Sequence, residues 1–177
     1  MNNFIVHSWL EAIMNNPTHR VKQTFKGSRV IFTLTQEYTA SIEEVFPLLC
    51  PVREYEYLPD CDLVYLATDY IEEAGIFITE FPQDGDDKDV WVVSQYIPNK
   101  SIQFVRVNTL RVIIYNIEVR SQEYAGVSLF WEQIITGLNP EGNKFVESLR
   151  EEGFVGMMDG MEKLLQYYLD TGAAMEH

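Results

Sequence analysis

The chain has 177 residues, of which 46% are hydrophobic and 23% are charged, and its formal net charge at pH 7 is −14. This length is enough for one domain with a hydrophobic core of its own. The acidic balance predicts no nucleic-acid partner, because phosphate backbones are bound through Lys and Arg, and no apolar run reaches the ~20 residues of a membrane-spanning helix, so no membrane insertion is expected.

The first 29 residues are predicted to form a helix and a connector outside the main domain. Apolar residues at helical spacing favour a helix over residues 4–14. Pro17 lies shortly after it, and the residue before a proline disfavours helix, so the helix ends there. The main domain is predicted to span residues 30–170, followed by a tail over residues 171–177.

Residues Val30–Tyr38 alternate between apolar and polar side chains, which predicts a half-buried strand. Ser41 is the predicted N-cap of a helix whose first turn holds acidic residues, where the helix dipole favours them. That helix is expected to end at Pro51, and a second short helical turn is expected over Arg53–Leu58.

Six more segments carry strand signals at regular spacing, with turn residues between them. Because the connections are short, neighbouring strands are expected to pair antiparallel. The segments are Asp62–Thr68, Gly75–Phe81, Val90–Ile97, Ser101–Val107, Leu110–Ser121 and Tyr124–Thr136. Alternation in the last two predicts inward faces formed by Ile113, Tyr115, Ile117, Val119, Val127, Leu129, Trp131 and Ile135.

The last predicted element is one long helix over Asn143–Leu169. Glycine inside a helix costs ~1 kcal/mol relative to alanine, so Gly153, Gly156 and Gly160 require an explanation. Close approach of the helix to the sheet is the favoured explanation, and free space for a ligand or a bend is the alternative. The predicted apolar stripe of this helix comprises Val146, Leu149, Gly153, Met157, Gly160, Met161, Leu164 and Tyr168.

The order of one strand, two short helices, six strands and a long helix is similar to that of the START-like/Bet v 1-like (SRPBCC) superfamily. Polyketide cyclase/dehydrase-like and Hsp90-activator-like proteins are the nearest groups. The resemblance rests on the segments YTASIEEVFPLL (Tyr38–Leu49), EYLPDC (Glu56–Cys61), YIPNKSIQF (Tyr96–Phe104) and EEGFVGMMDGMEKLLQYY (Glu151–Tyr168).

This resemblance implies an α+β helix-grip fold, in which a curved antiparallel sheet of about seven strands surrounds a long C-terminal helix. It also implies a hydrophobic cavity between the sheet and that helix. It does not imply a single function, because members of the superfamily bind lipids or hormones, shape polyketides or act as chaperone partners.

Aromatic and methionine side chains are the candidates for lining that cavity. Small-molecule sites are mostly apolar with a few polar groups, which Tyr and Trp supply, and methionine adapts to irregular shapes. Arg106 is the charged candidate for orienting a polar end of the ligand, although an edge or outward salt bridge is the favoured interpretation of its position. The candidate ligand-binding residues are Tyr65, Phe77, Phe104, Arg106, Tyr115, Trp131, Met157 and Met161.

No catalytic residue, cofactor or metal site is predicted. His7, His19 and His177 all lie outside the predicted barrel, which removes the commonest general base and transition-metal ligand from its interior. Cys50 and Cys61 form no CxxC motif and are expected to be buried small side chains. The low cysteine content and the absence of signal-peptide features favour a cytoplasmic location.

Three functions remain open at this point. The favoured one is binding of a small hydrophobic or aromatic ligand, lipid-like or polyketide-like, in the central cavity. The first alternative is a cyclase/aromatase-type enzyme acting on a polyketide-like substrate, which the lack of an evident buried carboxylate or histidine disfavours. The second is a protein–protein interaction module, as a chaperone partner or a homodimer, which is motivated by apolar residues on the predicted outer faces: Ile31, Val112, Ile114 and Phe130.

Overall fold

A computed structural model describes residues 25–50, 52–58, 64–67, 74–80, 88–121 and 126–175. The helix predicted over residues 4–14 lies outside these residues, as does Cys61. None of the helices in the described part of the chain combines the length and the apolar character needed to cross a lipid bilayer.

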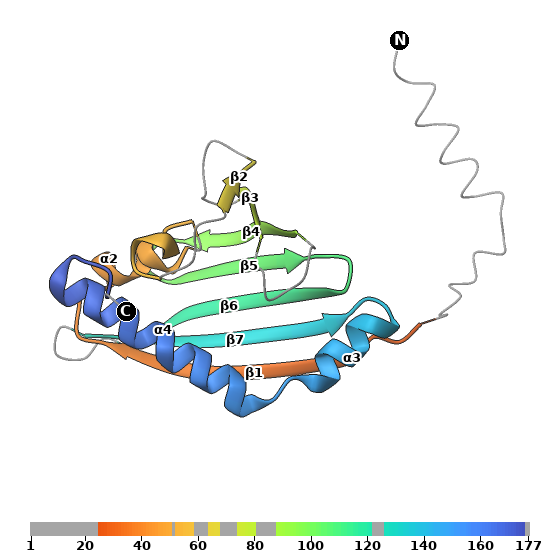
Figure 1. The fold of residues 1–177 in the computed structure, drawn as a ribbon. Helices are drawn as coiled ribbons and strands as arrows, with labels where there is room; N and C mark the ends of the chain where they lie inside the picture. Colours follow the sequence, from red (N-terminus) through yellow and green to blue (C-terminus); the bar gives the residue numbers. More distant parts are fainter. Residues whose placement is uncertain are drawn as a thin grey trace, which may run out of the picture.

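The described residues form a seven-stranded antiparallel sheet, which confirms the predicted α+β helix-grip architecture (Figure 1). The strand order is β1-β7-β6-β5-β4-β3-β2, so the first strand of the chain pairs with the last. The strands are β1 (Arg29–Tyr38), β2 (Val64–Leu66), β3 (Ile76–Thr79), β4 (Asp89–Ile97), β5 (Ser101–Val107), β6 (Arg111–Ser121) and β7 (Val127–Gly137).

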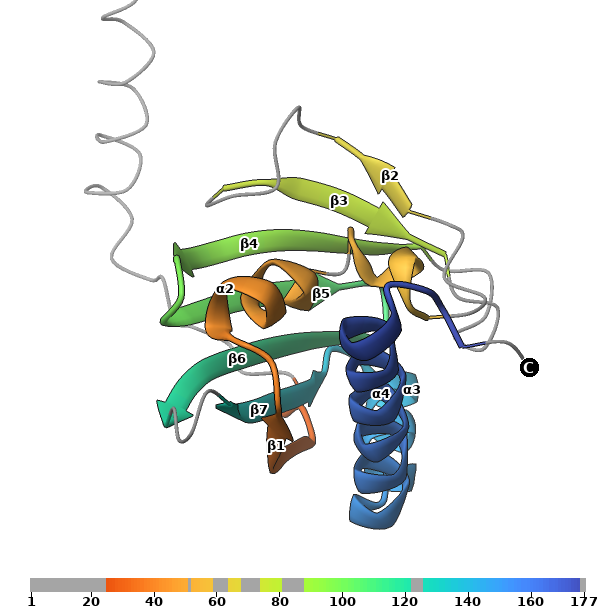
Figure 2. The same ribbon diagram turned by 90° about the vertical axis from the view of Figure 1, so that its left-hand side faces the viewer.

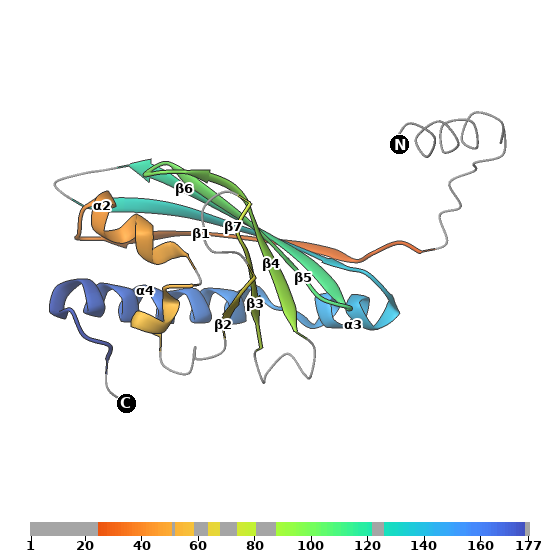
Figure 3. The ribbon, with the colours of Figure 1, turned by 90° about the horizontal axis from the view of Figure 1, so that it is seen from above.

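One face of the sheet carries the hydrophobic core, because side chains alternate between the two faces of a strand. In β7 the predicted inward residues Val127, Leu129, Trp131 and Ile135 are all buried, and Gln133 is buried between them. Every helix described lies on this same side, as Figures 2 and 3 show. On the opposite face, half of the surface of Ile31 is exposed, at 50%.

Two short helical segments follow β1 at the predicted positions. In α2 (Ile42–Val45) the Glu44 carboxylate accepts a hydrogen bond from the backbone N–H of Ser41 at 3.0 Å, which satisfies one of the unpaired donors at the helix start. The chain then tightens into the 3₁₀ turn η1 (Phe46–Leu49), and a second 3₁₀ turn, η2 (Glu54–Glu56), lies farther along. In Figure 2, α2 and the turn that follows it lie in front of the middle strands of the sheet, on the side that also carries the C-terminal helices.

The single long helix predicted over Asn143–Leu169 is wrong, because the structure has two helices, α3 (Pro140–Ser148) and α4 (Glu151–Thr171). Leu149 and Arg150 between them are extended, with ψ angles of 143° and 144°. Because of this break, the side chains of α4 do not continue the apolar stripe that a single helix would have formed. The buried residues of α4 are therefore Phe154, Met158 and Leu165, whereas the predicted stripe placed Gly153 and Met157 on that face.

The glycines of α4 do not pack closely against the sheet. A Cβ added at Gly153, Gly156 or Gly160 would meet no atom within 4 Å, so the favoured explanation for them is wrong and open space lies beside this helix. Gly142 of α3 differs, because a Cβ there would collide with the carbonyl oxygen of Leu110. Close approach of helix and sheet is therefore a property of α3.

This contrast predicts opposite effects for the same substitution in two helices. Gly156→Ala is expected to raise the free energy of unfolding by about 1 kcal/mol, because alanine has the higher helix propensity and nothing obstructs its methyl group. Gly142→Ala is expected to lower it, because the backbone at Leu110 must move. Urea denaturation followed by circular dichroism measures both, and a destabilising Gly156→Ala would contradict the open space.

Candidate ligand-binding cavity

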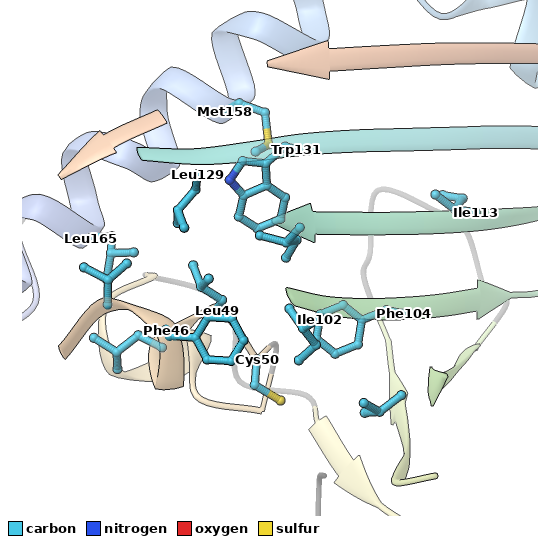
Figure 4. Close-up of a cluster of buried hydrophobic side chains, with 14 of the residues drawn as sticks. Phe46, Leu49, Cys50, Ile102, Phe104, Ile113, Leu129, Trp131, Met158 and Leu165 are labelled. Carbon is cyan, nitrogen blue, oxygen red and sulfur yellow. The ribbon is translucent and has the colours of Figure 1, made fainter. Parts of the chain in front are cut away.

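A cavity of about 250 Å³ lies between the sheet and α4. We call it the aromatic lobe, because aromatic and methionine side chains dominate its wall. Figure 4 shows Trp131 projecting from β7 into this interior, with Met158 of α4 and Leu49 of η1 around it. The lobe is lined by Leu49, Glu54, Leu58, Trp91, Phe104, Arg106, Tyr115, Trp131, Gln133, Met157, Met158 and Met161.

The aromatic wall is a layered stack. The ring of Trp91 lies 5.2 Å from that of Tyr115 and 5.3 Å from that of Phe77, and both pairs have stacked geometry. The indole Nε1–H of Trp91 donates to Thr79 Oγ1 at 2.8 Å, so this polar group is already satisfied. This part of the wall therefore offers aromatic ring surface to a ligand, and the indole N–H of Trp91 is not available to it.

Trp131 differs from Trp91 in one respect that bears on function. Its side chain is 6% exposed, and its Nε1–H has no hydrogen-bond acceptor among the described residues. A buried donor without a partner costs about 1–3 kcal/mol. A ligand that placed an oxygen acceptor against this N–H would remove that cost.

A buried charge cluster lies at the junction of β4, β5 and β6. Asp89 Oδ2 accepts a hydrogen bond from Arg106 Nε at 2.8 Å, and Arg111 Nη2 lies 3.6 Å from the same oxygen. The guanidinium of Arg106 covers the ring of Trp91 and its Nη1 donates to the Tyr115 hydroxyl at 3.4 Å. Although burial lowers the pKa of Arg106, Tyr115 and Asp89 raise it above its ordinary value, so this side chain stays charged.

The predicted outward position of Arg106 is therefore wrong, because its side chain points into the interior and is 11% exposed. Inside the protein, Asp89 supplies the counter-charge that makes a buried arginine tolerable.

Glu54 introduces a carboxyl group into the aromatic lobe from the turn η2. Burial raises the pKa of Glu54 to about 7, although the positive charge of Arg106 acts in the opposite direction. Burial also raises the pKa of Tyr115, which Arg106 in part offsets. Near neutral pH, Glu54 thus exchanges between a protonated donor and an ionised acceptor inside an apolar cavity.

A second cavity of about 430 Å³ adjoins the first, and Arg106, Tyr115, Gln133 and Met157 line both. We call it the arginine lobe. It extends to the junction of α3 and α4, and exposed residues of that junction form part of its wall. The residues that line only this lobe are Phe32, Arg111, Ile113, Ile135, Phe145, Ser148, Leu149, Arg150, Gly153 and Phe154.

Most of the sequence-predicted site residues meet at the aromatic lobe: Phe104, Arg106, Tyr115, Trp131, Met157 and Met161. Phe77 is fully buried but lies behind Trp91, where it supports the wall. The backbone of Tyr65 belongs to β2, and its side chain lies outside the described part of the structure.

Sequence reasoning missed several cavity residues. Gln133 follows Trp131 by two positions, so the alternation of β7 already pointed to its inward face. Trp91 lies in a strand that is apolar on both faces, and Glu54 lies in a three-residue turn, so neither had a periodic signal. Arg111, Ile113 and Tyr115 occupy alternate positions of β6, so their side chains lie on the same face of the sheet, which indicates an inward position for Arg111 in spite of its charge.

Cys50 is buried, as expected for a small core side chain, and burial raises the pKa of its thiol to about 11. Within the described residues, no group of three His, Cys, Asp or Glu side chains is arranged to hold a metal ion.

No family model matches the sequence, and no curated protein matches it significantly. Solved structures match the fold. Ara h 8.0201 has a TM-score of 0.60 at 8% identity, over 80% of this chain and 97% of that chain. Norcoclaurine synthase from Thalictrum flavum, in complex with dopamine and hydroxybenzaldehyde, has a TM-score of 0.57 at 14% identity, over 80% of this chain and 89% of that chain.

DynU16, a protein of the dynemicin biosynthetic locus, has a TM-score of 0.56 at 15% identity, over 83% of this chain and 49% of its own. At identities this low, a structural match indicates a shared fold and does not indicate a shared site chemistry. The chain thus shares the fold of these proteins, which agrees with its resemblance to the START-like/Bet v 1-like (SRPBCC) superfamily.

Proposed function

We propose that this protein binds a small hydrophobic or aromatic ligand, of lipid-like or polyketide-like chemistry, in the two-lobed cavity between the sheet and α4. The observation that carries the proposal is the buried Trp131 N–H, which lines the aromatic lobe without an acceptor among the described residues. A cavity made only to fill the core would not need an unsatisfied donor in its wall.

The expected affinity comes from two sources. Apolar surface transferred from water into the aromatic lobe contributes about 25 cal/mol per Å². An acceptor on the ligand adds one buried hydrogen bond at Trp131. The methionines of α4, Met157, Met158 and Met161, can adapt their side chains to ligands of different shape.

Native mass spectrometry of the purified protein, repeated under denaturing conditions, tests the proposal directly. A small mass that accompanies the native protein and is lost on denaturation would identify the chemical class of the ligand. If the protein carries no such mass, titration with 2-acetylnaphthalene, a neutral aromatic ketone, tests whether the cavity accepts a ligand. Failure to bind any apolar aromatic compound would contradict the proposal.

Trp131→Phe is expected to weaken 2-acetylnaphthalene binding about tenfold, which corresponds to the loss of one buried hydrogen bond of ~1.4 kcal/mol. Trp91→Phe is the matched control, because the Trp91 N–H is already bound to Thr79 and is not available to a ligand. Isothermal titration calorimetry measures both affinities. Equal losses in the two variants would show that the Trp131 N–H has no special role.

Catalysis of proton transfer, as in a cyclase/aromatase-type enzyme, is a second candidate, and Glu54 is the observation that favours it. A carboxyl group whose pKa lies near 7 can serve as a general acid or base at neutral pH, and it lines the lobe together with Tyr115. The discriminating measurement is exchange of the methyl protons of 2-acetylnaphthalene in D₂O. An enzyme accelerates this exchange and loses the acceleration in Glu54→Gln, whereas a binding protein does not accelerate it.

A further inference from the structure

The arginine lobe has a charge composition opposite to that of the chain. Acidic residues outnumber Lys and Arg by 27 to 13 in the sequence. Yet the described residues that line this lobe include Arg106, Arg111 and Arg150 and no Asp or Glu. A concave, low-dielectric surface lined by one sign of charge focuses its potential on the space it encloses. Asp89 pairs with both Arg106 and Arg111 and offsets one of the three charges, so the lobe keeps an excess of positive charge and favours an anion, although the net charge of the whole chain is −14.

The three arginines occupy defined positions along the lobe. Arg106 and Arg111 form its inner end, where Asp89 holds both guanidinium groups in place. Arg150 lies at the outer end, in the extended junction between α3 and α4, and its Nη1 donates to the carbonyl oxygens of Glu147 and Leu149, both at 2.8 Å. Cationic groups thus stand at the entrance and at the inner end.

The walls between these ends are apolar. The rings of Phe32 and Phe154 stack 5.1 Å apart, and the guanidinium of Arg111 lies 4.7 Å from the ring centre of Phe145. A site with cationic ends and apolar walls matches a molecule with one anionic group on a hydrophobic body. The cavity volume of about 430 Å³ suits a small molecule and not an extended polyanion.

We propose that the arginine lobe recognises the carboxylate group of an apolar or aromatic ligand that enters at the junction of α3 and α4. The proposal rests on the proposed function, because the hydrophobic body of the same ligand extends into the aromatic lobe. A carboxylate fits these groups because its negative charge complements the guanidinium groups and because it accepts charge-assisted hydrogen bonds from them. Arg150 captures the anion at the surface, and Arg106, which lines both lobes, holds it inside.

Two probes of nearly equal shape test this assignment: 2-naphthoate, which carries the carboxylate, and 2-acetylnaphthalene, which is neutral. Calorimetric titrations at pH 6, where Glu54 is largely protonated, are expected to give at least about tenfold tighter binding of 2-naphthoate. Arg150→Gln is expected to weaken 2-naphthoate about threefold and to leave 2-acetylnaphthalene unchanged. Arg120→Gln is the matched control, because Arg120 lies over Phe130 on the outer face of the sheet.

Arg106→Gln is expected to reduce the preference for 2-naphthoate to less than about twofold. This variant alters a buried ion pair and can fail to fold, so a substitution at the exposed entrance provides an independent test. Arg150→Glu, which reverses the charge, is expected to weaken 2-naphthoate binding more than Arg150→Gln does and to leave 2-acetylnaphthalene binding unchanged. Equal affinities for the two probes, or equal effects of Arg150 variants on both, would overturn the carboxylate site while the proposed function stands. Failure of both probes to bind would overturn both proposals.

Discussion

Asp89→Asn is expected to lower the free energy of unfolding by about 3–5 kcal/mol, which is the cost of removing one partner from a buried ion pair. Asp89 is 1% exposed and faces the guanidinium groups of both Arg106 and Arg111. Asparagine keeps the shape of the side chain but removes the negative charge, so two buried cations lose the carboxylate they share. Since domains of this size are stable by about 5–15 kcal/mol, the variant approaches the limit of folding.

Urea denaturation at 25 °C, followed by circular dichroism, measures this loss. Glu118→Gln is the matched control, because Glu118 pairs with Arg120 at 3.5 Å on the surface, where both side chains are about half exposed. Surface pairs contribute at most ~1 kcal/mol. The double variant Asp89→Asn/Arg106→Gln is expected to recover part of the lost stability, because it also removes one of the buried cations. A cost for Asp89→Asn no greater than that of the control would contradict the buried charge cluster.

Glu54→Gln is expected to stabilise the protein at alkaline pH. Burial raises the pKa of Glu54 from 4.5 to about 7, so the folded protein holds this proton more tightly than the unfolded chain does. The contribution of this protonated carboxyl group to the free energy of unfolding is fully present below pH 4.5 and is lost as the pH rises to 7 and above. For a pKa raised from 4.5 to about 7, the unfolding free energy falls by about 3 kcal/mol between pH 4 and pH 8.5. Glutamine cannot ionise, so the variant avoids this loss.

The measurement is the difference in unfolding free energy between Glu54→Gln and the unmodified protein, taken at pH 4, 6 and 8.5. We expect this difference to grow in favour of the variant across the series. Asp159→Asn, which removes an exposed carboxylate of α4, is the control for the change in net charge. A difference that stays constant with pH would show that Glu54 titrates as it does in water and does not enter the cavity.

The sequence by itself determined the sheet. The alternation of apolar side chains predicts the apolar residues on the inward face of β7, and Phe104, Tyr115 and Trp131, which are candidates on their aromatic character, do line the cavity. The physical reason is that strand alternation is a local property: the side chain at each second position faces the core whatever the neighbouring strand is. The same holds for Ser41, since helix capping involves only residues within one turn.

The tertiary structure alone decided the charged part of the site and the course of the C-terminal helices. Arg106 is buried because Asp89, from another strand, reaches its guanidinium, and Glu54 lines the cavity from the aperiodic turn η2. Leu149 and Arg150 break the helix although their side chains suit one. The burial of Arg106 depends on a partner distant in sequence, about which a local pattern contains no information, and neither the turn of Glu54 nor the break at Leu149 and Arg150 has a periodic signal.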